Sequence, residues 1–455
     1  MADDDVSGLR EGLAGAVLTD GDEGWDTARI AFNLLIDQRP AAIVLPERVE
    51  DVVAAVGFAR ESGLRVAPQR TGHNAGPLGD LSETLLVRTD RLGGATIDAD
   101  ARRAAVGPAA KWGDVTGPAS DAGLAPLAGS SPNVGVVGYT LGGGLSWLGR
   151  EHGLACNSVR SVQLVNAAGE VVHSDASNNR DLFWALRGGG GGLGVVTGME
   201  FDLHEVAELY AGMLAWPWER GGEVLEAWRE WTAGAPEEAS SIGRFVQVPP
   251  FEEIPELVRG KRLAIVEVAF LGGEEEGAEL IAPLRELGPE IDTFGSVPPA
   301  ALGFLHMDPP EPVPGLTDHA LLGELPAEAI EALLESAGPD SGSPLVSVEL
   351  RHLGGALARE PEDAGALARL DGAFSLFGVG MVANEEMGSA VGEALARVRK
   401  AHTSWETGAL FGNFCERRME DSPFFTRESY DRLCEIKSAH DPDDLFRASH
   451  PIPPG

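Results

Sequence analysis

Cysteine, basic side chains and long apolar runs are all scarce in this chain. The three cysteines, Cys156, Cys415 and Cys434, are odd in number and lack the paired spacing of a metal site, so we expect free thiols in a reducing compartment. No apolar run approaches the ~20 residues that a membrane helix needs. The N-terminus, Met1–Asp5, lacks the basic-then-apolar pattern of a secretion signal. We therefore expect a cytoplasmic protein with no membrane partner.

Basic residues are few in this sequence. Lysine and arginine total 35 against 71 aspartates and glutamates, which gives a formal net charge of −36. Nucleic acids and anionic membranes need a basic surface, so neither is expected as a partner, and we interpret the acidic excess as a solvated surface. The 455 residues, 43% of them hydrophobic, instead indicate a globular protein, and the length favours two domains.

Glycine, by contrast, is abundant, with 59 residues, and much of it falls in three loops. The first loop, Pro68–Gly76, holds a single imidazole, His73, between glycines. The second loop spans Gly135–Gly144 and the third spans Gly188–Gly194. Glycine lets backbone approach a ligand closely and leaves N–H groups free to face anionic oxygens. His73 alone would be an ordinary structural or solvent histidine, but the three loops together favour one large, phosphate-bearing cofactor.

The third loop contains Gly189, Gly191 and Gly194, which match the G-x-G-x-x-G pattern of dinucleotide-binding proteins. That fingerprint must follow a strand and open a helix, whereas these glycines follow an expected helix and precede an expected strand. A simple nicotinamide site is therefore disfavoured, and the loop is either part of another cofactor site or purely structural. The second loop is entered through Pro132 and interleaves apolar residues with glycines, which favours a ligand surface over a flexible surface loop.

The remaining pattern predicts two regions with different character. Short strands alternate with helices up to about residue 205, and longer strands interleaved with helices follow, which suggests an α+β domain with an antiparallel sheet. In the first region we expect strands at 42–45, 65–68, 85–88, 95–98, 103–106, 159–165, 171–173 and 194–203, and helices at 50–60, 111–122 and 179–186. In the second we expect strands at 210–216, 242–248, 262–270, 318–323, 344–352 and 374–382, and helices at 221–233, 274–287, 326–337 and 388–402.

Candidate catalytic side chains lie on the expected strand at 344–352. Alternation places Glu349 and Arg351 on one face of that strand and Leu350 and His352 on the other. Glu349 and His352 are candidates for contact with a substrate, although a core or surface role is the simpler interpretation of each. No Ser-His-Asp order, H-E-x-x-H motif or cysteine cluster is present in the sequence, so we expect neither hydrolysis nor a metal site.

Four motifs occur in a characteristic order: Gly72-His73-Asn74, the loop Pro132–Gly144, the segment Leu182–Thr197, and the tail Asp441–Arg447. In this combination the chain resembles the flavin oxidoreductases that have a p-cresol methylhydroxylase-type FAD domain. Within them it is similar to the berberine-bridge-enzyme-like branch, especially bacterial members similar to 6-hydroxy-D-nicotine oxidase. The likeness runs from about residue 41 to 201 and returns near the C-terminus.

The resemblance implies an α+β, bilobal protein that binds FAD. An FAD-binding domain of two α/β subdomains would span residues 1–205, with its core at 37–205. A substrate-binding domain with an antiparallel sheet flanked by helices would span 206–405, and 406–455 would return to the FAD domain. In this family the loop histidine, here His73, bonds covalently to the 8α carbon of the flavin and so raises its reduction potential. Plant relatives add a cysteinyl bond just before the loop proline, where this chain has Ser131, so we expect a single attachment.

The resemblance also suggests site residues. Relatives carry a Tyr-x-Asn-Tyr motif that reads Phe411-Gly412-Asn413-Phe414 here, so a tyrosinate base at that site is excluded. Val134 stands where small residues tend to admit oxygen to the flavin, which favours an oxidase. The catalytic candidates are then His352, Glu349, Asn413 and Tyr139. The expected cofactor-binding residues are Arg70, Thr71, Gly72, His73, Asn74, Ser131, Pro132, Val134, Gly135, Gly138, Tyr139, Gly142, Gly143, Gly144, Gly153, Leu154, Asn157, Gly194, Val195, Val196 and His450.

The function implied is that of an FAD-dependent oxidase with a small-molecule substrate and molecular oxygen as its partners. A hydride would pass from a small alcohol or amine to the flavin N5, and oxygen would reoxidise the flavin to give hydrogen peroxide. Two alternatives remain open, namely a dehydrogenase that uses another acceptor and a non-catalytic flavin-binding protein. A homo-oligomer is possible, and the sequence does not name the substrate.

Overall fold

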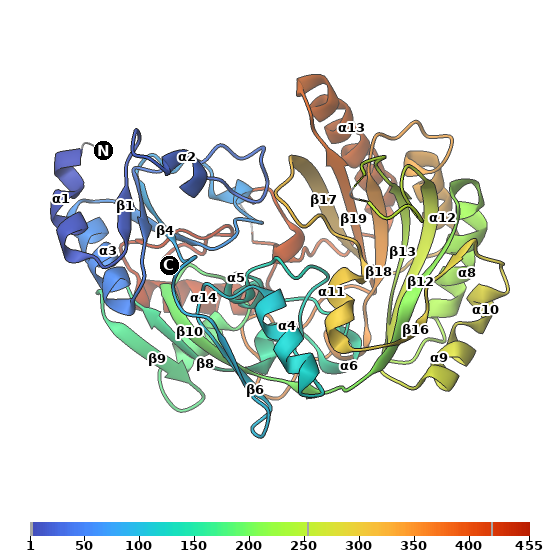
Figure 1. Cartoon of the computed structure of the whole chain (residues 1–455), viewed down its shortest axis with the longest axis horizontal. Coiled ribbons are helices and arrows are strands. Elements are labelled where there is room, and N and C mark those ends of the chain that lie inside the picture. Colours follow the sequence, from blue (N-terminus) through green and yellow to red (C-terminus); the bar gives the residue numbers. More distant parts are fainter. Residues whose placement is uncertain (1–2, 253, 420–421) are drawn as a thin grey trace.

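Two lobes lie side by side along the long axis of the molecule, and the chain passes from the first lobe to the second and back (Figure 1). This computed structural model describes residues 3–252, 254–419 and 422–455. Sheets of four and five strands form the centre of the first lobe, and a sheet of eight strands forms the second. The fold class predicted from the sequence, α+β with an antiparallel sheet in the second lobe, is confirmed.

The four-stranded sheet has the order β1-β2-β4-β3 and is parallel except for the antiparallel pair of β1 and β2. The interior residues of its strands are apolar, as expected of a sheet covered on both faces, with polar residues at the ends of β3 and β4. Val44, Val66 and Val87 are fully buried. The elements of this part are α1 (Asp3–Gly12), β1 (Ala16–Leu18), α2 (Trp25–Ala28), β2 (Ala42–Leu45), α3 (Val49–Glu61), β3 (Arg65–Gln69) and β4 (Thr84–Arg88).

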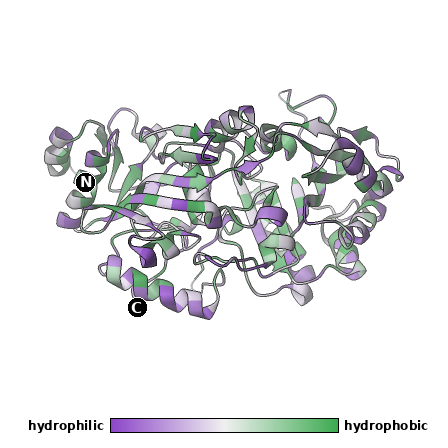
Figure 2. Cartoon of the chain, turned by 90° about the horizontal axis from the view of Figure 1, so that it is seen from below, coloured by the Kyte–Doolittle hydropathy of each residue, from purple (hydrophilic) through white to green (hydrophobic). Residues whose placement is uncertain are grey.

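The five-stranded sheet, in the order β5-β6-β10-β8-β9, is antiparallel throughout. Hydrophilic and hydrophobic residues alternate along strands of this lobe (Figure 2), as expected when one face of a sheet packs on the core. Its elements are β5 (Ala95–Asp98), β6 (Arg103–Val106), α4 (Trp112–Asp121), β7 (Leu124–Ala125), α5 (Val136–Leu141), α6 (Gly149–His152), β8 (Val159–Val165), β9 (Val171–Asp175), α7 (Arg180–Leu186), β10 (Val195–Asp202) and β11 (His204–Glu205).

The eight-stranded sheet follows the path β15-β12-β14-β13-β18-β19-β17, with β16 beside β12. Its strands are β12 (Leu209–Pro217), β13 (Ala239–Gln247), β14 (Arg262–Phe270), β15 (Ile291–Asp292), β16 (Gly295–Val297), β17 (Gly315–Leu322), β18 (Ser347–His352) and β19 (Phe374–Met381). Its helices are α8 (Gly221–Thr232), α9 (Glu274–Leu280), α10 (Ala282–Arg285), α11 (Leu302–Leu305), α12 (Ala327–Ala337) and α13 (Glu385–His402).

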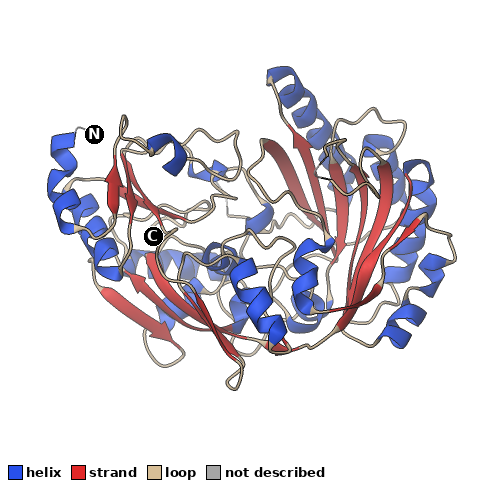
Figure 3. Ribbon diagram, viewed as in Figure 1, coloured by secondary structure: helices blue, strands red, loops and turns tan. Residues whose placement is uncertain are grey.

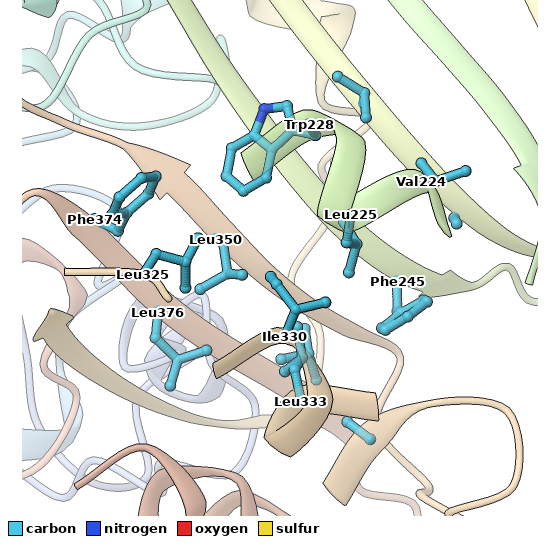
Figure 4. Close-up of a cluster of buried hydrophobic side chains, with 14 of the residues drawn as sticks. Val224, Leu225, Trp228, Phe245, Leu325, Ile330, Leu333, Leu350, Phe374 and Leu376 are labelled. Atoms are coloured by element: carbon cyan, nitrogen blue, oxygen red, sulfur yellow. The ribbon is translucent and has the colours of Figure 1, made fainter. Parts of the chain in front are cut away.

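Helices cover the outer face of this sheet, and the opposite face looks toward the first lobe (Figure 3). Trp228 of α8 and Ile330 of α12 are buried against strand residues such as Leu350 and Leu376 (Figure 4). Burying a side chain of this size contributes roughly 1.5–3 kcal/mol, so this core fixes the sheet on which the inward-facing side chains stand.

The C-terminal segment returns to the first lobe after the eight-stranded sheet is complete. Helix α14 (Arg427–His440) packs on α7. The strand β3 then gains a short extension, because Val66 N–H donates to Leu445 O at 2.8 Å and Arg447 N–H donates to Val66 O at 2.8 Å. Asp441 stabilises the turn between α14 and this extension by accepting hydrogen bonds from the backbone N–H groups of Leu445 and Phe446. The tail is therefore part of the lobe that contains the His73 loop.

Two expected elements differ from the structure. The helix expected at 274–287 is divided into α9 and α10, with Pro283 near the start of the second helix, where its missing N–H is tolerated. The second glycine loop contains helix α5, whose Val136, Val137 and Leu141 are buried in the core of the first lobe.

All three cysteines are free thiols. Among the described residues, no helix combines the length and apolarity needed to cross a membrane.

Candidate active site

His73 lies in the turn that follows β3, on the side of the first lobe where the C-terminal tail also lies. Gly72 has a φ of 76°, and a Cβ there would approach Gln69 and Ala31 to within about 3.0 Å, so the turn requires glycine. The imidazole stacks on Phe32, with ring centroids 3.7 Å apart. Burial lowers the pKa of His73 to about 4, and its buried Nε2 has no hydrogen-bond partner among the described residues. His73 is therefore a neutral imidazole with a nitrogen left for a ligand.

Asn74 joins the first glycine loop to the C-terminal part of the chain. Its Nδ2 donates to Gly412 O at 3.1 Å, and its own carbonyl oxygen accepts from Ser449 Oγ at 2.5 Å. His450 Nε2 donates to the same Gly412 O at 2.9 Å. Within the part of the chain that the structure describes, two buried atoms here lack a partner: Asn74 Oδ1 and His450 Nδ1. Buried polar atoms are nearly always satisfied, so this cluster fits a bound polar molecule.

The second loop is held to the start of α4 by main-chain contacts and lies against the first loop where Gly135 meets Arg70. Trp112 N–H donates to Val134 O at 3.0 Å, and Gly113 N–H donates to Pro132 O at 2.8 Å. A Cβ on Gly135 would meet the side chain of Arg70 at 3.2 Å. Ser131 is buried beside this junction and has only a long contact, 3.4 Å, from Asn133 N–H to its Oγ. The two loops therefore form one surface.

Most glycines of the second and third loops serve close packing within the protein. A Cβ on Gly142 would overlap Asn413, one on Gly143 would overlap Leu367, and one on Gly144 would overlap Tyr139. Gly194 is similarly closed in by residues of β8. Gly138 and Gly190 differ, because nothing lies within 4 Å of a Cβ placed on either residue, and Gly138 is exposed. Fewer backbone positions are therefore open to a flat ligand than the number of glycines in these loops predicted.

Several of the expected cofactor residues are engaged by other parts of the protein. Arg70 forms an ion pair with Asp90 at 2.7 Å and donates from Nε to Ala109 O. The side-chain amide of Asn157 bonds to the backbone of residues 365–368 on both its nitrogen and its oxygen. Thr71 accepts Phe32 N–H through its carbonyl oxygen. The remaining members, Gly153, Leu154, Val195 and Val196, belong to turns and buried strands next to these contacts.

Tyr139 and Asn413, both catalytic candidates, contact each other's segments. Tyr139 donates its hydroxyl to Leu127 O at 3.1 Å and packs edge-on against Trp112. Burial raises the pKa of Tyr139 well above its usual value. Asn413 Nδ2 donates to Tyr139 O at 2.9 Å. Both polar groups therefore already have protein partners. Asn413 connects the glycine loop to the segment that follows Phe411, and the Tyr139 hydroxyl connects it to Leu127.

A buried network of charges lies on the inner face of the eight-stranded sheet. Glu349 accepts from Arg351 Nε at 2.6 Å and lies 2.8 Å from His306 Nε2, while His306 Nδ1 lies 2.7 Å from Glu267. Arg244 completes it at 2.5 Å from Glu267. Burial and Arg244 oppose protonation of His306, but the two glutamates raise its pKa to about 9. Burial likewise opposes ionisation of Glu349, yet Arg351 and His306 hold the pKa of that carboxyl well below its usual range.

Arg351 and His352 line a small cavity between the two lobes. Its other lining residues come from the second glycine loop region, from β13 and from the segment after β18, and they are Ser130, Leu145, Ser146, Trp147, Ser240, Ser241, Ile242, Leu353 and Leu357. The guanidinium of Arg150 lies 3.1 Å from His352 Nε2. Burial and Arg150 lower the pKa of His352 to about 3. The structure thus brings His352 and the Glu349–Arg351 pair to the same inter-lobe region, although His73 and His450 lie in a separate cluster of contacts.

Several residues that contribute to this region were not identified from the sequence, among them Arg244, Glu267 and His306 of the charged network. Phe32 and Asp308 are remote from every motif, and Asp308 accepts from Ser130 Oγ at 2.6 Å. Trp147 and Arg150 directly follow the glycines of the second loop, and that proximity was the available signal. In the described ranges, no group of three or more histidine, cysteine, aspartate or glutamate side chains is arranged to hold a metal ion.

Comparison with known proteins identifies the class of this fold. A family model described as "FAD binding domain" matches residues 40–175, and one described as "Berberine and berberine like" matches residues 416–453. The solved 6-hydroxy-D-nicotine oxidase from Arthrobacter nicotinovorans matches with a TM-score of 0.80 and 24% identity, covering 97% of this chain and 98% of that one. The fold is therefore that of the flavoproteins with a p-cresol methylhydroxylase-type FAD domain.

Sequence relatives place the chain within that class. It is 31% identical to the uncharacterized FAD-linked oxidoreductase YvdP of Bacillus subtilis over 97% of this chain and 98% of the relative. It is 36% identical to the glucooligosaccharide oxidase of Sarocladium strictum, over 46% of this chain and 43% of that protein. The chain belongs to the berberine-bridge-enzyme-like family of FAD-linked oxidoreductases, and the resemblance inferred from its motifs is confirmed.

Proposed function

We propose that the protein is an FAD-dependent oxidase of a small alcohol or amine. The substrate loses a hydride from the carbon that bears its oxygen or nitrogen and a proton from that heteroatom. Bound FAD supplies the hydride acceptor at N5 and passes two electrons to molecular oxygen, which takes up two protons and leaves as hydrogen peroxide. The chain's own part is to hold the cofactor, to orient the donor carbon and to admit oxygen.

The observation that carries this proposal is the state of His73. A neutral imidazole, buried against Phe32 and left with an unpartnered nitrogen, is the form that can attack the 8α carbon of a flavin. Forming that bond removes one hydrogen from the imidazole and one from the methyl group, and oxygen accepts the two electrons. Ser131 stands where a second, cysteinyl bond would form, and a hydroxyl does not make that thioether. We therefore propose one covalent attachment.

The residues around His73 fit the cofactor in chemical terms. Asn74 Oδ1 and His450 Nδ1 are buried without partners in the described chain, and the open backbone at Gly138 leaves room for a flat group. We propose that these three positions contact the flavin directly. Arg70, Asn157 and Tyr139, whose polar groups are engaged elsewhere, would shape the site by holding its loops.

None of the catalytic candidates Glu349, His352 and Tyr139 is a free, strong base. Glu349 is ionised but engaged by Arg351 and His306, and His352 is a neutral imidazole whose pKa lies near 3. Tyr139 cannot serve, because its hydroxyl is engaged and burial raises its pKa. This supports substrates that part with their proton readily, such as a neutral amine or an activated alcohol. Glu349 would orient Arg351, and Asn413 would orient the glycine loop.

An anaerobic substrate screen tests the proposal. The purified, flavin-loaded protein is mixed without oxygen with alcohols, sugars and amines, and loss of the yellow flavin absorbance is followed. Air is then admitted and peroxide is measured. The proposal predicts that at least one compound bleaches the flavin and that air restores the colour with one peroxide per substrate oxidised. A flavin that stays reduced in air would show a dehydrogenase instead, and a flavin that no compound bleaches would show a binding protein.

A further inference from the structure

We propose that the cavity beside Arg351 is a subsite for a carboxylate, so that the substrates of this enzyme are small alcohols or amines that carry an acid group. This inference rests on the oxidase function proposed above and concerns the second lobe, where no cofactor residue was expected. Its basis is a set of hydrogen-bond donors on residues that line one cavity, together with the charge of the cavity wall.

The Nδ1–H group of His352 is the first donor. The Nε2 of this ring faces a guanidinium nitrogen of Arg150 at 3.1 Å, and arginine can only donate. Nε2 must therefore accept, which places the single proton of the neutral ring on Nδ1. That Nδ1 is buried and has no partner among the described residues, and the residue lines the cavity. Arg150 is itself fixed by bonds to the backbone oxygens of Ala239 and Leu353, so the ring is held in this state.

Trp147 provides a second donor at the same cavity. Its indole Nε1 is buried and likewise unpartnered in the described chain, although an indole N–H usually finds an acceptor when buried. Arg351 provides the third, because its Nε is bound to Glu349 while its guanidinium lies at the cavity wall. Two buried donors without acceptors among the described residues, together with a guanidinium on the same cavity lining, indicate that an oxygen-rich group of a ligand is the missing partner.

The charges around the cavity favour an anion over a neutral oxygen. Among the described residues that line the cavity, Arg351 is the one cation and no carboxylate is present, while Glu349 contacts Arg351 from outside this lining. The cavity wall thus carries a positive charge in a largely buried setting, where an anion is the favourable partner. A substrate carboxylate would neutralise it and hold the rest of the molecule between the lobes.

Calorimetric binding of propionate and of its neutral isostere propionamide to the flavin-loaded protein tests this subsite. We expect propionate to bind at least about tenfold more tightly, as a charge-assisted set of bonds should. Trp147→Phe removes only the N–H and should weaken propionate binding roughly three- to tenfold. Trp218→Phe is the matched control, because Trp218 also has a buried, unpartnered Nε1 but packs on Phe245 in the helix-covered core. It should leave propionate binding unchanged.

Arg351→Gln should reduce propionate affinity by more than about tenfold, and a thermal unfolding curve of that variant shows whether its sheet remains folded. Equal affinities for propionate and propionamide would overturn the proposal, as would equal effects of the two tryptophan variants. The outcome is independent of turnover. Selective propionate binding in a protein that yields no peroxide from any substrate would refute the oxidase function and leave the subsite standing. Peroxide formation without any preference for acid-bearing substrates, or for propionate over propionamide, would refute the subsite and leave the oxidase function standing.

Discussion

The size of the Val134 side chain bears on whether the protein acts as an oxidase or as a dehydrogenase. Its backbone is fixed, because Val134 O accepts from Trp112 N–H at 3.0 Å. The neighbouring Gly135 packs on Arg70, so the loop cannot shift easily to make room for a larger residue. The side chain is half-buried and packs at the edge of the first lobe's core. In the proposed function, its small size leaves a path for oxygen.

Val134→Leu should therefore slow reoxidation by oxygen by about tenfold, equivalent to about 1.4 kcal/mol of barrier, without changing anaerobic reduction by substrate. Stopped-flow absorbance of the flavin measures the two half-reactions separately. Val134→Ala is the control and should reoxidise at least as fast as the natural protein. If the leucine variant reoxidises at the natural rate, this residue does not govern oxygen access.

At the scale of elements, one ionic network joins three strands and the segment after α11. Arg244 comes from β13, Glu267 from β14, and Glu349 with Arg351 from β18, while His306 follows α11. The imidazolium of His306 lies between two buried carboxylates and compensates the negative charge of both. Removing one partner from a buried ion pair leaves an uncompensated charge and is strongly destabilising.

The pH dependence of stability follows from the raised pKa of His306. A histidine ionises near 6.5 in an unfolded chain and at about 9 here, so its stabilising contribution is complete below pH 6.5 and is lost as the pH rises through 9. His306→Gln should lower the free energy of unfolding by about 3 kcal/mol at pH 6, and the difference should shrink toward pH 9. Urea unfolding at the two pH values measures this.

A surface histidine serves as the control for that measurement. His173 is about half exposed and pairs with Asp175 at 3.0 Å, so His173→Gln should change the free energy of unfolding by less than about 1 kcal/mol. If the effect of His306→Gln were the same at pH 6 and pH 9, the imidazole would not be carrying its charge between the two glutamates.

Sequence periodicity predicted the long elements well because their burial is regular. The strands at 262–270 and 374–382 and the helix at 326–337 lie within a residue or two of β14, β19 and α12. Helix α5 was missed because its glycine-rich surroundings suggested a loop, whereas the burial of Val136 and Val137 makes it a helix. The prediction that Glu349 and Arg351 share a face of their strand agrees with their 2.6 Å contact.

The candidate site was only partly accessible to sequence reasoning. His73 stood out because of its glycine neighbours, but its stacking partner Phe32 comes from a segment without a motif. Arg70 was expected to contact the cofactor, and its pairing with Asp90 depends on a strand that the local pattern does not connect to it. Trp147 was missed because an unsatisfied indole N–H is a property of the folded surroundings and leaves no trace in composition or spacing.

At the scale of the whole molecule, the two lobes meet around one imidazole and one polar cavity. The first lobe supplies His73 and the glycine loops, and the C-terminal end of the chain contacts the first loop where Ser449 Oγ donates to Asn74 O. The second lobe supplies strand β18, whose Arg351 and His352 both line the cavity. The account depends on a flavin anchored to the first lobe within reach of that face.

Mass spectrometry of the denatured, full-length protein tests the anchoring most directly. The natural chain should carry the added mass of one FAD and stay yellow after acid precipitation, because the bond through His73 survives unfolding. His73→Ala should have the mass of the bare chain and release any flavin into the supernatant. A natural chain with the bare mass, or a His73→Ala chain that still carries covalent flavin, would contradict the account.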